Sequence, residues 1–307
     1  MIGSVMNNSR YVIITPAHNE QDYIIYAIQS ILCQTIKPIQ WIIVNDGSTD
    51  KTKEIIESHI VKYDFMKLIN LKRDGGHNFG NKAIAFMKGY AEICNIDYDY
   101  IGNLDADIML DPDYYKMIIE KYNEDIGLGI AGGIVYTKIG NGYFTSDKTA
   151  DSVGGAVQLF RRPCFDAVGG YVPLQYGGID AAAEIKAKML GWKVRKYLEH
   201  KVFEQRRTGS AGVSLLESRV SEGKRFYSLG YDSFFYFIRC IYRLRDRPFI
   251  IGSIAAFCGF MGSIIRCRPI LLPPQVVSYL RTEQRRRLKT MQDKLLGINS
   301  IFYFIIS

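Results

Sequence analysis

Short apolar runs alternate with amphipathic segments between residues 11 and 200 of the chain. The run Tyr11–Thr15 is largely apolar and is followed at once by Pro16, which is typical of a buried parallel strand. Residues 21–34 place their apolar side chains on one helical face, and Gln40–Asn45 is again strand-like. The same alternation predicts further strands at 66–71, 100–104 and 153–160, and further helices over 51–63, 80–94 and 180–191.

This order of elements favours the α/β fold class. Successive strand–helix units predict a Rossmann-like, mostly parallel sheet flanked by helices on both faces. Beyond residue 200 the pattern changes, because 219–247 is an aromatic, arginine-rich helical stretch and Phe249–Ile265 lacks any charge. A proline-rich segment and a basic helix over 279–296 follow. We therefore expect two domains, over 1–210 and 211–307.

The charge of the chain also separates these two parts. The formal net charge of +8 combines 21 basic and 24 acidic residues up to residue 200 with 18 basic and 7 acidic residues after it. The first part therefore carries a net charge of −3 and the second of +11. This division excludes a uniformly basic nucleic-acid-binding protein, and we expect no nucleic acid among the partners.

Residue spacing excludes several common kinds of site. The six cysteines are scattered without a CxxC pair, which argues against structural zinc and redox motifs. No GxGxxG follows the first strand, and the order Gly80-Asn81-Lys82-Ala83 differs from a Walker phosphate loop. The first ten residues are polar and no secretory signal follows them, so we expect the catalytic part in a reducing cytoplasm.

Polar residues gather where three of the predicted strands end. Ligands of open α/β sheets bind beyond the carboxyl ends of the strands, so these residues are candidates for a site. Glu20 follows the first strand, Asp46 ends the second, and Asp105 and Asp107 follow the strand at 100–104. Two carboxylates at this spacing suit Mg²⁺ or Mn²⁺ bound to phosphate groups, because such ions take their remaining ligands from substrate and water.

Each candidate also has a local structural interpretation. Asp46 precedes a glycine and is compatible with an ordinary turn, and Glu20 is compatible with an acid in the first turn of a helix. Asp105 and Asp107 are compatible with a solvated turn, although Asp111 before a proline already predicts the N-cap of the next helix. An aspartate that opens the helical run 181–190 is likewise compatible with an N-cap.

Taken together and in order, these segments resemble the family 2 glycosyltransferases of the GT-A fold, including those of bacterial and archaeal surface polysaccharides. The resemblance covers roughly residues 10–210. The segments that carry it are VIITPAHNE (12–20), WIIVNDGSTDKT (41–52), Lys72-Arg73 with Gly80-Asn81-Lys82-Ala83, NLDADI (103–108), GGAVQLFRR (154–162), Gly169-Gly170-Tyr171 and GGIDAAAEIKAKMLGWKV (177–194).

The resemblance implies a role for each candidate. The implied roles are a nucleoside pocket lined by Ala17 and Glu20, a base contact from Asp46 with Arg73 beside it, a ribose or metal contact from Asp105, a divalent metal ion (Mg²⁺ or Mn²⁺) on Asp107, and a catalytic base at Asp180. Many relatives carry a metal-site histidine in the stretch that here contains Glu204 and Gln205. The nearest histidine is His200, so the third metal ligand is left open.

The activity that the resemblance implies is the inverting, metal-dependent transfer of one sugar. The donor would be a UDP- or GDP-sugar and the acceptor a lipid-linked or other glycan of the cell surface. Residues 205–207 differ from the QxxRW signature of processive synthases, which favours a single addition. One alternative is a synthase that uses polyprenyl phosphate itself as acceptor. A second is an inactive module that binds nucleotide sugar or membrane.

The uncharged run Phe249–Ile265 predicts contact with a membrane. Its 17 residues reach ~26 Å as a helix, against a hydrocarbon core of ~30 Å. Arginines lie on both sides of the run, and the two sides of a single crossing cannot both be cytoplasmic. We therefore expect an interfacial or re-entrant segment at the cytoplasmic face of the cell membrane, supported by the basic helix 279–296. A spanning helix and a buried helix are the alternatives.

Overall fold

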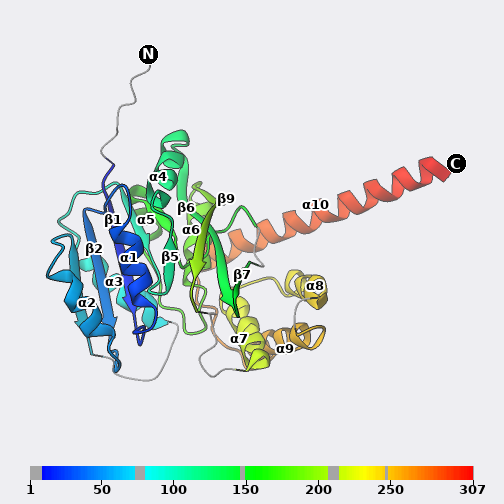
Figure 1. Cartoon of the computed structure of the whole chain (residues 1–307). Coiled ribbons are helices and arrows are strands. Elements are labelled where there is room, and N and C mark those ends of the chain that lie inside the picture. The colour runs from blue at the N-terminus through cyan, green and yellow to red at the C-terminus, as the bar shows by residue number, and fades with distance from the viewer. Residues whose placement is uncertain (1–8, 73–79, 146–148, 207–213, 246–247, 307) are drawn as a thin grey trace, which may run out of the picture. The chain divides into compact units, whose positions relative to one another are not determined.

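The computed structural model describes residues 9–72, 80–145, 149–206, 214–245 and 248–306, and of these the side chains of Arg245 and 294–306 are not described. The chain divides into two compact units, Met1–Ser210 and Ala211–Ser307 (Figure 1). The expected Arg73 and the glycine-rich residues 75–79 lie outside the described residues.

One mixed sheet of nine strands organises the described part of the first unit. Its first half is parallel, as predicted, in the order β3-β2-β1-β4. These strands are β1 (Tyr11–Ala17), β2 (Gln40–Asp46), β3 (Met66–Leu71) and β4 (Tyr100–Asn103). The sequence predicts these four strands correctly, and β1, β2 and β4 are short, mostly buried runs, whereas β3 is buried only at Met66.

The second half of the sheet mixes strand directions. Its strands are β5 (Ile108–Leu110), β6 (Leu128–Ile139), β7 (Gly142–Phe144), β8 (Leu159–Arg161) and β9 (Lys193–Glu204). Strand β8 is antiparallel to β4 and β6, whereas β6 and β9 are parallel. Strand β5 is antiparallel to β9, which brings the segment after β4 beside the end of β9.

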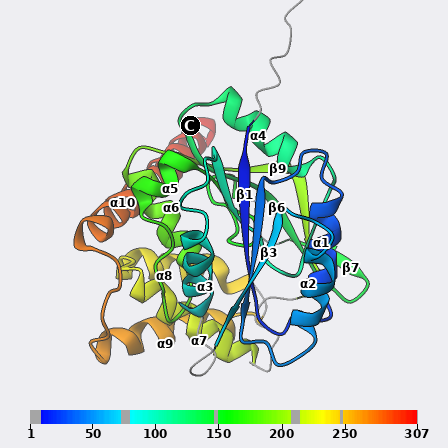
Figure 2. The same ribbon diagram turned by 90° about the vertical axis from the view of Figure 1, so that its left-hand side faces the viewer.

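Helices cover both faces of this sheet (Figure 2). On one face lie α1 (Ile24–Leu32) and α2 (Thr52–Ile60), and on the other lie α3 (Gly80–Ala91), α5 (Arg162–Val168) and α6 (Ile179–Met189). Helix α4 (Tyr114–Glu124) packs its apolar side into the same core as α1. Its N-cap is Asp113 rather than the predicted Asp111, so the capping argument from the sequence is wrong at that position.

The predicted strand at 153–160 is also wrong over most of its length, because β8 begins only at Leu159. The preceding residues turn, with the amide of Val157 bonded to the carbonyl of Gly154 at 3.1 Å. A side chain on α6 takes the place of a strand partner, since the amide of Val153 donates to Glu184 Oε1 at 2.6 Å. The segment therefore forms a loop that α6 holds against the end of β4.

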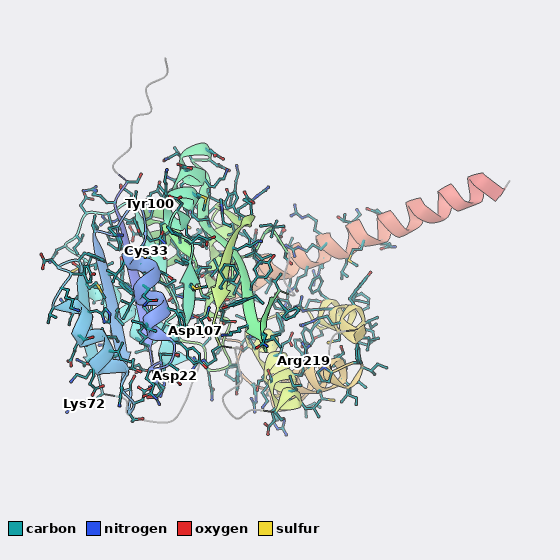
Figure 3. All side chains as sticks on the ribbon, viewed as in Figure 1. Asp22, Cys33, Lys72, Tyr100, Asp107 and Arg219 are labelled. Carbon is teal, nitrogen blue, oxygen red and sulfur yellow. The ribbon has the colours of Figure 1, made fainter. Side chains whose placement is uncertain are left out.

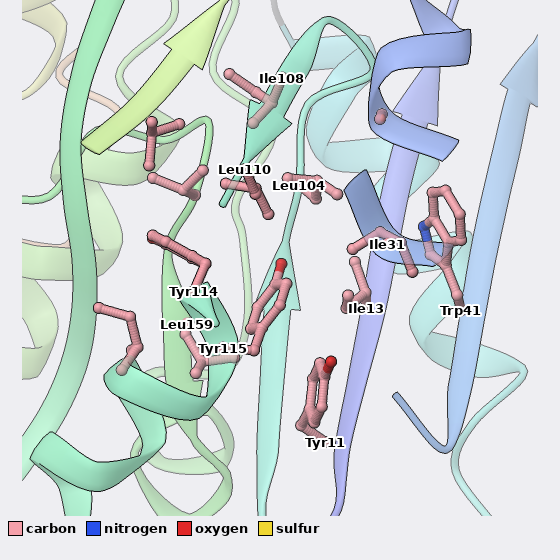
Figure 4. Close-up of a cluster of buried hydrophobic side chains, with 14 of the residues drawn as sticks. Tyr11, Ile13, Ile31, Trp41, Leu104, Ile108, Leu110, Tyr114, Tyr115 and Leu159 are labelled. Atoms are coloured by element: carbon pink, nitrogen blue, oxygen red, sulfur yellow. The ribbon is translucent and has the colours of Figure 1, made fainter. Parts of the chain in front are cut away.

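Large aromatic side chains fill the core between the sheet, α1 and α4 (Figure 4). The rings of Tyr11 and Tyr115 stack at 4.7 Å, and the hydroxyl of Tyr11 donates to the carbonyl of Ile36 at 2.7 Å. Trp41 Nε1 donates to Thr15 Oγ1 at 2.9 Å. Because their polar atoms are bonded, these residues add apolar burial without an unsatisfied group. The core thus gives rigid support to the strands whose ends carry the candidate site.

The second unit is helical in its described residues, as the sequence predicts. It contains α7 (Leu215–Ser228), α8 (Ser233–Tyr242), the 3₁₀ turn Arg243–Arg245, α9 (Ile251–Ile265) and α10 (Pro274–Ile306). The predicted helical stretch 219–247 is broken at Gly230, whose φ of 81° is in the left-handed region. Asp232 then caps α8 by accepting from the amides of Phe234 and Phe235. None of the helices described reaches the length and apolarity needed to cross a bilayer.

Helices α7 and α9 pack backbone against backbone. A Cβ added at Gly223 of α7 would overlap the carbonyl oxygen of Ala256, and one added at Gly259 of α9 would overlap that of Val220. Around this contact the rings of Tyr236 and Phe260 stack at 4.4 Å. Glycine at both positions is therefore what lets the two helices approach so closely.

Two glycines of α9 allow this packing to be tested, one at the contact with α7 and one away from it as a control. Gly259→Ala is expected to lower the free energy of unfolding of the helical unit by about 1–3 kcal/mol, because the methyl group forces α7 and α9 apart. Gly262→Ala meets only the end of the Arg266 side chain, at 3.1 Å, and should gain about 0.5–1 kcal/mol of helix propensity. Urea unfolding followed by circular dichroism measures both. Equal stability of the two variants would contradict the close approach.

Candidate active site

The loops after β1 and β2 are bonded into one structure at the carboxyl edge of the parallel strands. The amide of Asn19 donates to Ser48 Oγ at 3.0 Å, and the amide of Thr49 donates to Asn19 Oδ1 at 2.8 Å. His18 Nδ1 lies 2.7 Å from the carbonyl oxygen of Asp46. Asn19 has a φ of 55°, which asparagine tolerates better than most residues. Ala17 and Asp46 end the two adjacent strands and therefore lie at this shared edge, as the sequence predicts.

Glu20 lies between this edge and a guanidinium group. It precedes α1, which begins at Ile24, so its interpretation as a first-turn helix acid is wrong. Its Oε1 lies 2.5 Å from Arg206 Nη2, whereas its Oε2 is buried and has no hydrogen-bond donor among the described residues. Burial raises the pKa of Glu20 to about 7, although Arg206 acts in the opposite direction. Glu20 is thus a strongly desolvated carboxyl group with one oxygen still available.

The two aspartates after β4 occupy different surroundings. Asp105 lies 2.5 Å from Lys82 Nζ and also accepts from Asn103 Nδ2 at 3.0 Å. The side chain of Asp107 is only 10% exposed and lies 3.7 Å from Arg206 Nε (Figure 3). A solvated turn is therefore the wrong interpretation for Asp107. Burial, reinforced by the charges of Asp105, Glu204 and Glu20, raises the pKa of Asp107 to about 8.

Asp180 belongs to the first turn of α6 but does not cap it. The N-cap is Gly178, with a φ of 88°, so the capping alternative is wrong. Asp180 Oδ2 instead accepts from the amide of Gly155 at 3.2 Å, in the loop for which the sequence predicts a strand. This bond holds the carboxylate against the loop that also contacts Asp105, whose amide donates to the carbonyl of Ala156 at 3.0 Å.

Lys82 forms an ion pair with Asp105 and interacts electrostatically with Asp180 and Asp107. Although burial acts to lower the pKa of Lys82, the charges of Asp105, Asp180 and Asp107 raise it above its ordinary value. The structure therefore gathers the three aspartates around one ammonium group. Glu20 joins them through Arg206, whereas Ala17 and Asp46 lie at the β1–β2 edge.

Sequence reasoning gave no role to Lys82 and Arg206. Lys82 stands in one of the segments that carry the family resemblance, which was the available signal. No sequence signal points to Arg206. Its position near Asp107 follows from the pairing of β9 with β5, in which Glu204 is opposite Ile108. His200 lies elsewhere on β9, next to Tyr197, and the charged groups that act on it are Glu199, Lys121 and Glu120.

The carboxylates fit a divalent cation in charge and in chemistry. Among the described residues, no three His, Cys, Asp or Glu side chains are arranged to hold a metal ion by themselves. Mg²⁺ and Mn²⁺ are nevertheless held by one or two carboxylates when a phosphate and water complete their coordination. Burial, followed by the nearby charges of Asp105, Glu204 and Glu20, raises the pKa of Asp107, and a bound cation would offset both effects. Asp105 and Asp107 are the residues that would hold such an ion.

Comparison with known proteins gives this arrangement a context. Residues 12–173 match the family described as glycosyl transferase family 2. The chondroitin synthase of Escherichia coli is 32% identical over 113 residues, which are 37% of this chain and 15% of the synthase. The chain thus matches only a small part of the length of that relative.

Two solved structures share the fold. Residues 1–349 of S. aureus TarS, in complex with UDP-GlcNAc, superpose with a TM-score of 0.53 at 15% identity, over 82% of this chain and 71% of that TarS chain. The mannosyltransferase PcManGT from Pyrobaculum calidifontis, in complex with GDP-Man and Mn²⁺, superposes with a TM-score of 0.52 at 14% identity, over 94% and 85% of the two chains. The GT-A fold implied by the sequence is confirmed.

Glu184 is a buried acid that supports the site without belonging to it. Its Oε1 accepts from the amide of Val153 at 2.6 Å and from Gln158 Nε2 at 3.1 Å. Gln158 Oε1 in turn accepts from the hydroxyl of Tyr171 at 2.7 Å. Burial raises the pKa of Glu184 to about 7, well above its ordinary 4.5. The folded protein therefore retains a proton on Glu184 that the unfolded chain releases at lower pH.

Because the folded protein binds this proton more tightly than the unfolded chain does, its free energy of unfolding should depend on pH. The variant Glu184→Gln should remove that dependence. The contribution of Glu184 to the free energy of unfolding is fully present below about pH 4.5, where the carboxyl group is protonated in both states. It is lost as the pH rises through about 7, and the loss amounts to ~3 kcal/mol. The glutamine side chain of this variant would accept the same bonds but cannot ionise. The stability of the variant relative to wild type should therefore increase between pH 5 and pH 8, as urea unfolding measures. Glu57→Gln on the exposed side of α2 is the control, and parallel pH profiles for all three proteins would refute the role of Glu184.

Proposed function

The chain belongs to glycosyl transferase family 2, and we propose that it transfers one sugar from a nucleoside diphosphate sugar to an acceptor hydroxyl group. The observation that carries the proposal is the ion pair of Asp105 with Lys82 at 2.5 Å, next to the buried Asp107 and to the loop whose Gly155 amide holds Asp180. The proposed setting is the assembly of a cell-surface polysaccharide or glycan, since a matching relative is named a chondroitin synthase. The complexes of TarS with UDP-GlcNAc and of PcManGT with GDP-Man support UDP- or GDP-sugars as donors.

The β1–β2 edge is the proposed nucleoside pocket. Ala17 ends β1 and is buried, so it would form part of the floor of this pocket. Asp46, at the end of β2, offers a carboxylate to the ring N–H of the base. Glu20, whose buried Oε2 has no hydrogen-bond partner among the described residues, would line the nucleoside pocket beside them. The bonds between the two loops fix these groups before the donor arrives.

Asp107, with Asp105, is the proposed holder of Mg²⁺ or Mn²⁺ on the donor diphosphate. When bound, such an ion neutralises the negative charge that grows on the leaving diphosphate. Lys82 and Arg206 contribute two fixed positive charges on this side of the site. They stabilise the same developing charge through the electrostatic field of the protein.

Asp180 is the proposed general base. A carboxylate that removes the proton of the acceptor hydroxyl on the face opposite the leaving diphosphate gives inversion at the sugar carbon. The bond from the amide of Gly155 fixes one oxygen of Asp180 and leaves the other for the acceptor.

A lipid-linked glycan at the cytoplasmic face of the cell membrane is the proposed acceptor. The net charge of +11 after residue 200 supports attraction to an anionic membrane surface. Transfer to a lipid-linked glycan would give a new glycosidic bond between sugars. A sugar monophosphate on polyprenol as the product would instead assign the acceptor as polyprenyl phosphate, and absence of turnover with every donor would refute the transferase.

Asp107→Asn is expected to abolish the metal-dependent part of donor binding, because a neutral amide is a poor ligand for Mg²⁺ or Mn²⁺. The melting temperature measured with UDP- and GDP-sugars, with and without Mn²⁺, reports this binding by mass action. Asp111→Asn removes a carboxylate of the same kind from an exposed position and should behave as wild type. A metal-dependent shift that survives in Asp107→Asn would remove Asp107 from the metal site.

Asp180→Asn is expected to retain donor binding and to lower the turnover number by about 10²–10⁴, the usual contribution of a general base. Transfer is measured by the release of nucleoside diphosphate and by analysis of the glycan. The new side-chain amide can still accept from the backbone amide of Gly155, so the loop should keep its structure. Wild-type turnover in this variant would leave Asp180 with a structural role only.

A further inference from the structure

Gln205 is the first residue after β9 and stands directly opposite Asp107. The register of β5 and β9 pairs Ile108 with Glu204, and the backbone amide of Gln205 continues it by donating to the carbonyl of Asp107 at 2.9 Å. Residues that face each other across an antiparallel pair carry their side chains on the same face of the sheet, with their Cβ atoms about 5 Å apart. The side chains of Gln205 and Asp107 are therefore neighbours in the candidate active site.

A hydroxyl group on the hairpin of β6 and β7 fixes the orientation of this side chain (Figure 1). Tyr143 donates its hydroxyl to Gln205 Oε1 at 2.9 Å, and its ring packs edge-on against Phe203 with the ring centres 5.0 Å apart. Phe203 is two residues before Gln205 and therefore projects from the same face of the chain. The bond from Tyr143 occupies the oxygen of the Gln205 amide and leaves the nitrogen for another partner.

The nitrogen of this amide has no such partner in the part of the chain that the structure describes. Gln205 is only 8% exposed, and its Nε2 is buried without an acceptor. The adjacent acid, Glu204, projects from the opposite face and accepts from Thr137 Oγ1 at 2.6 Å. A buried donor without an acceptor costs free energy of folding, and native proteins retain few such groups. The Nε2 group therefore suits an oxygen atom that arrives with a ligand.

We propose that Gln205 donates through Nε2 to a phosphate oxygen of the nucleoside diphosphate, and that Tyr143 is the positioning residue that orients the amide for this bond. An amide N–H bonds more strongly to an anionic oxygen than to a neutral sugar hydroxyl, which favours the phosphate as its acceptor. The amide is also uncharged, so it adds no repulsion to a cation held by Asp107. The contact deepens the proposed function and rests on it for the identity of the ligand.

Gln205→Met tests the donor, because methionine keeps the length of the side chain but cannot donate. With Mn²⁺ present, it should bind whichever of UDP and GDP the wild type binds about 10–100-fold more weakly, as isothermal titration calorimetry measures. Its stability to urea without ligand should equal or exceed that of wild type, because an unsatisfied buried donor is removed. Gln40→Met, at the opposite end of β2 from Asp46, is the control and should keep wild-type affinity. A less stable variant with wild-type affinity would assign Gln205 a structural role only.

A double-mutant cycle tests the role of Tyr143. Tyr143→Phe keeps a ring against Phe203 but leaves the amide free to turn, and it should weaken nucleoside diphosphate binding about 3–10-fold. In Gln205→Met no amide remains to be oriented, so adding Tyr143→Phe should cause no further loss. Tyr136→Phe changes another ring that packs on Phe203 and should bind as wild type does. Equal losses from Tyr143→Phe with and without the amide of Gln205 would overturn the positioning role.

Gln205→Glu distinguishes a phosphate contact from a metal contact through the oxygen of the side chain. At alkaline pH the glutamate has no proton to donate and repels phosphate, so UDP and GDP should bind as weakly as to Gln205→Met or more weakly. Wild-type affinity at a lower Mn²⁺ concentration would make residue 205 a ligand of the ion and would overturn the proposal. A wild type that binds neither UDP nor GDP would refute the donor site of the proposed function as well, whereas variants that all bind as wild type does would refute only the contact from Gln205.

Discussion

Repulsion between carboxylates is the constraint on which the first unit depends. The parallel strands deliver Asp105 and Asp107 to one edge of the sheet, and α6 brings Asp180 to the same place. Charges of one sign in a poorly hydrated site repel each other strongly unless a cation lies among them. Lys82 on α3 supplies that cation, and Arg206 supplies a second one between Glu20 and Asp107. The site is therefore a balance of charges contributed by helices and strands that are far apart in the sequence.

The loop before β8 helps to hold these charged side chains in place. Residues 153–158 have no strand partner along most of their length, and bonds to Glu184, Gln158 and Asp180 replace it. Tyr171 bonds Gln158 and packs edge-on against Phe86 of α3, the helix that carries Lys82. A buried polar network of this kind specifies a single arrangement when its members are satisfied. The three aspartates and the lysine are thus fixed relative to one another through one small network.

The sequence predicted those elements whose formation depends on residues close together in the chain. The strands β1, β2 and β4 are short apolar runs, and the acids at their ends follow from that assignment. The loop at 153–158 was predicted wrongly because its backbone bonds go to side chains of α6, which hydrophobic periodicity does not encode. Arg206 escaped prediction because only the pairing of β9 with β5 places it beside Asp107. In α9 the composition predicted a helix, but it did not reveal that the glycine and alanine face would lie inward together with Phe260.

The glycines and alanine between α7 and α9 also bear on the entropy of folding. Residues such as Gly223, Ala256 and Gly259 have no side-chain rotamers to lose when they are buried. At these positions the two helices therefore associate without a loss of side-chain entropy, although Tyr227 and Phe260 are ordered beside them. The exposed isoleucines of α9, Ile251 and Ile254, keep much of their rotamer freedom in the folded unit, so the folding of the unit does not bear the full entropic cost of ordering them.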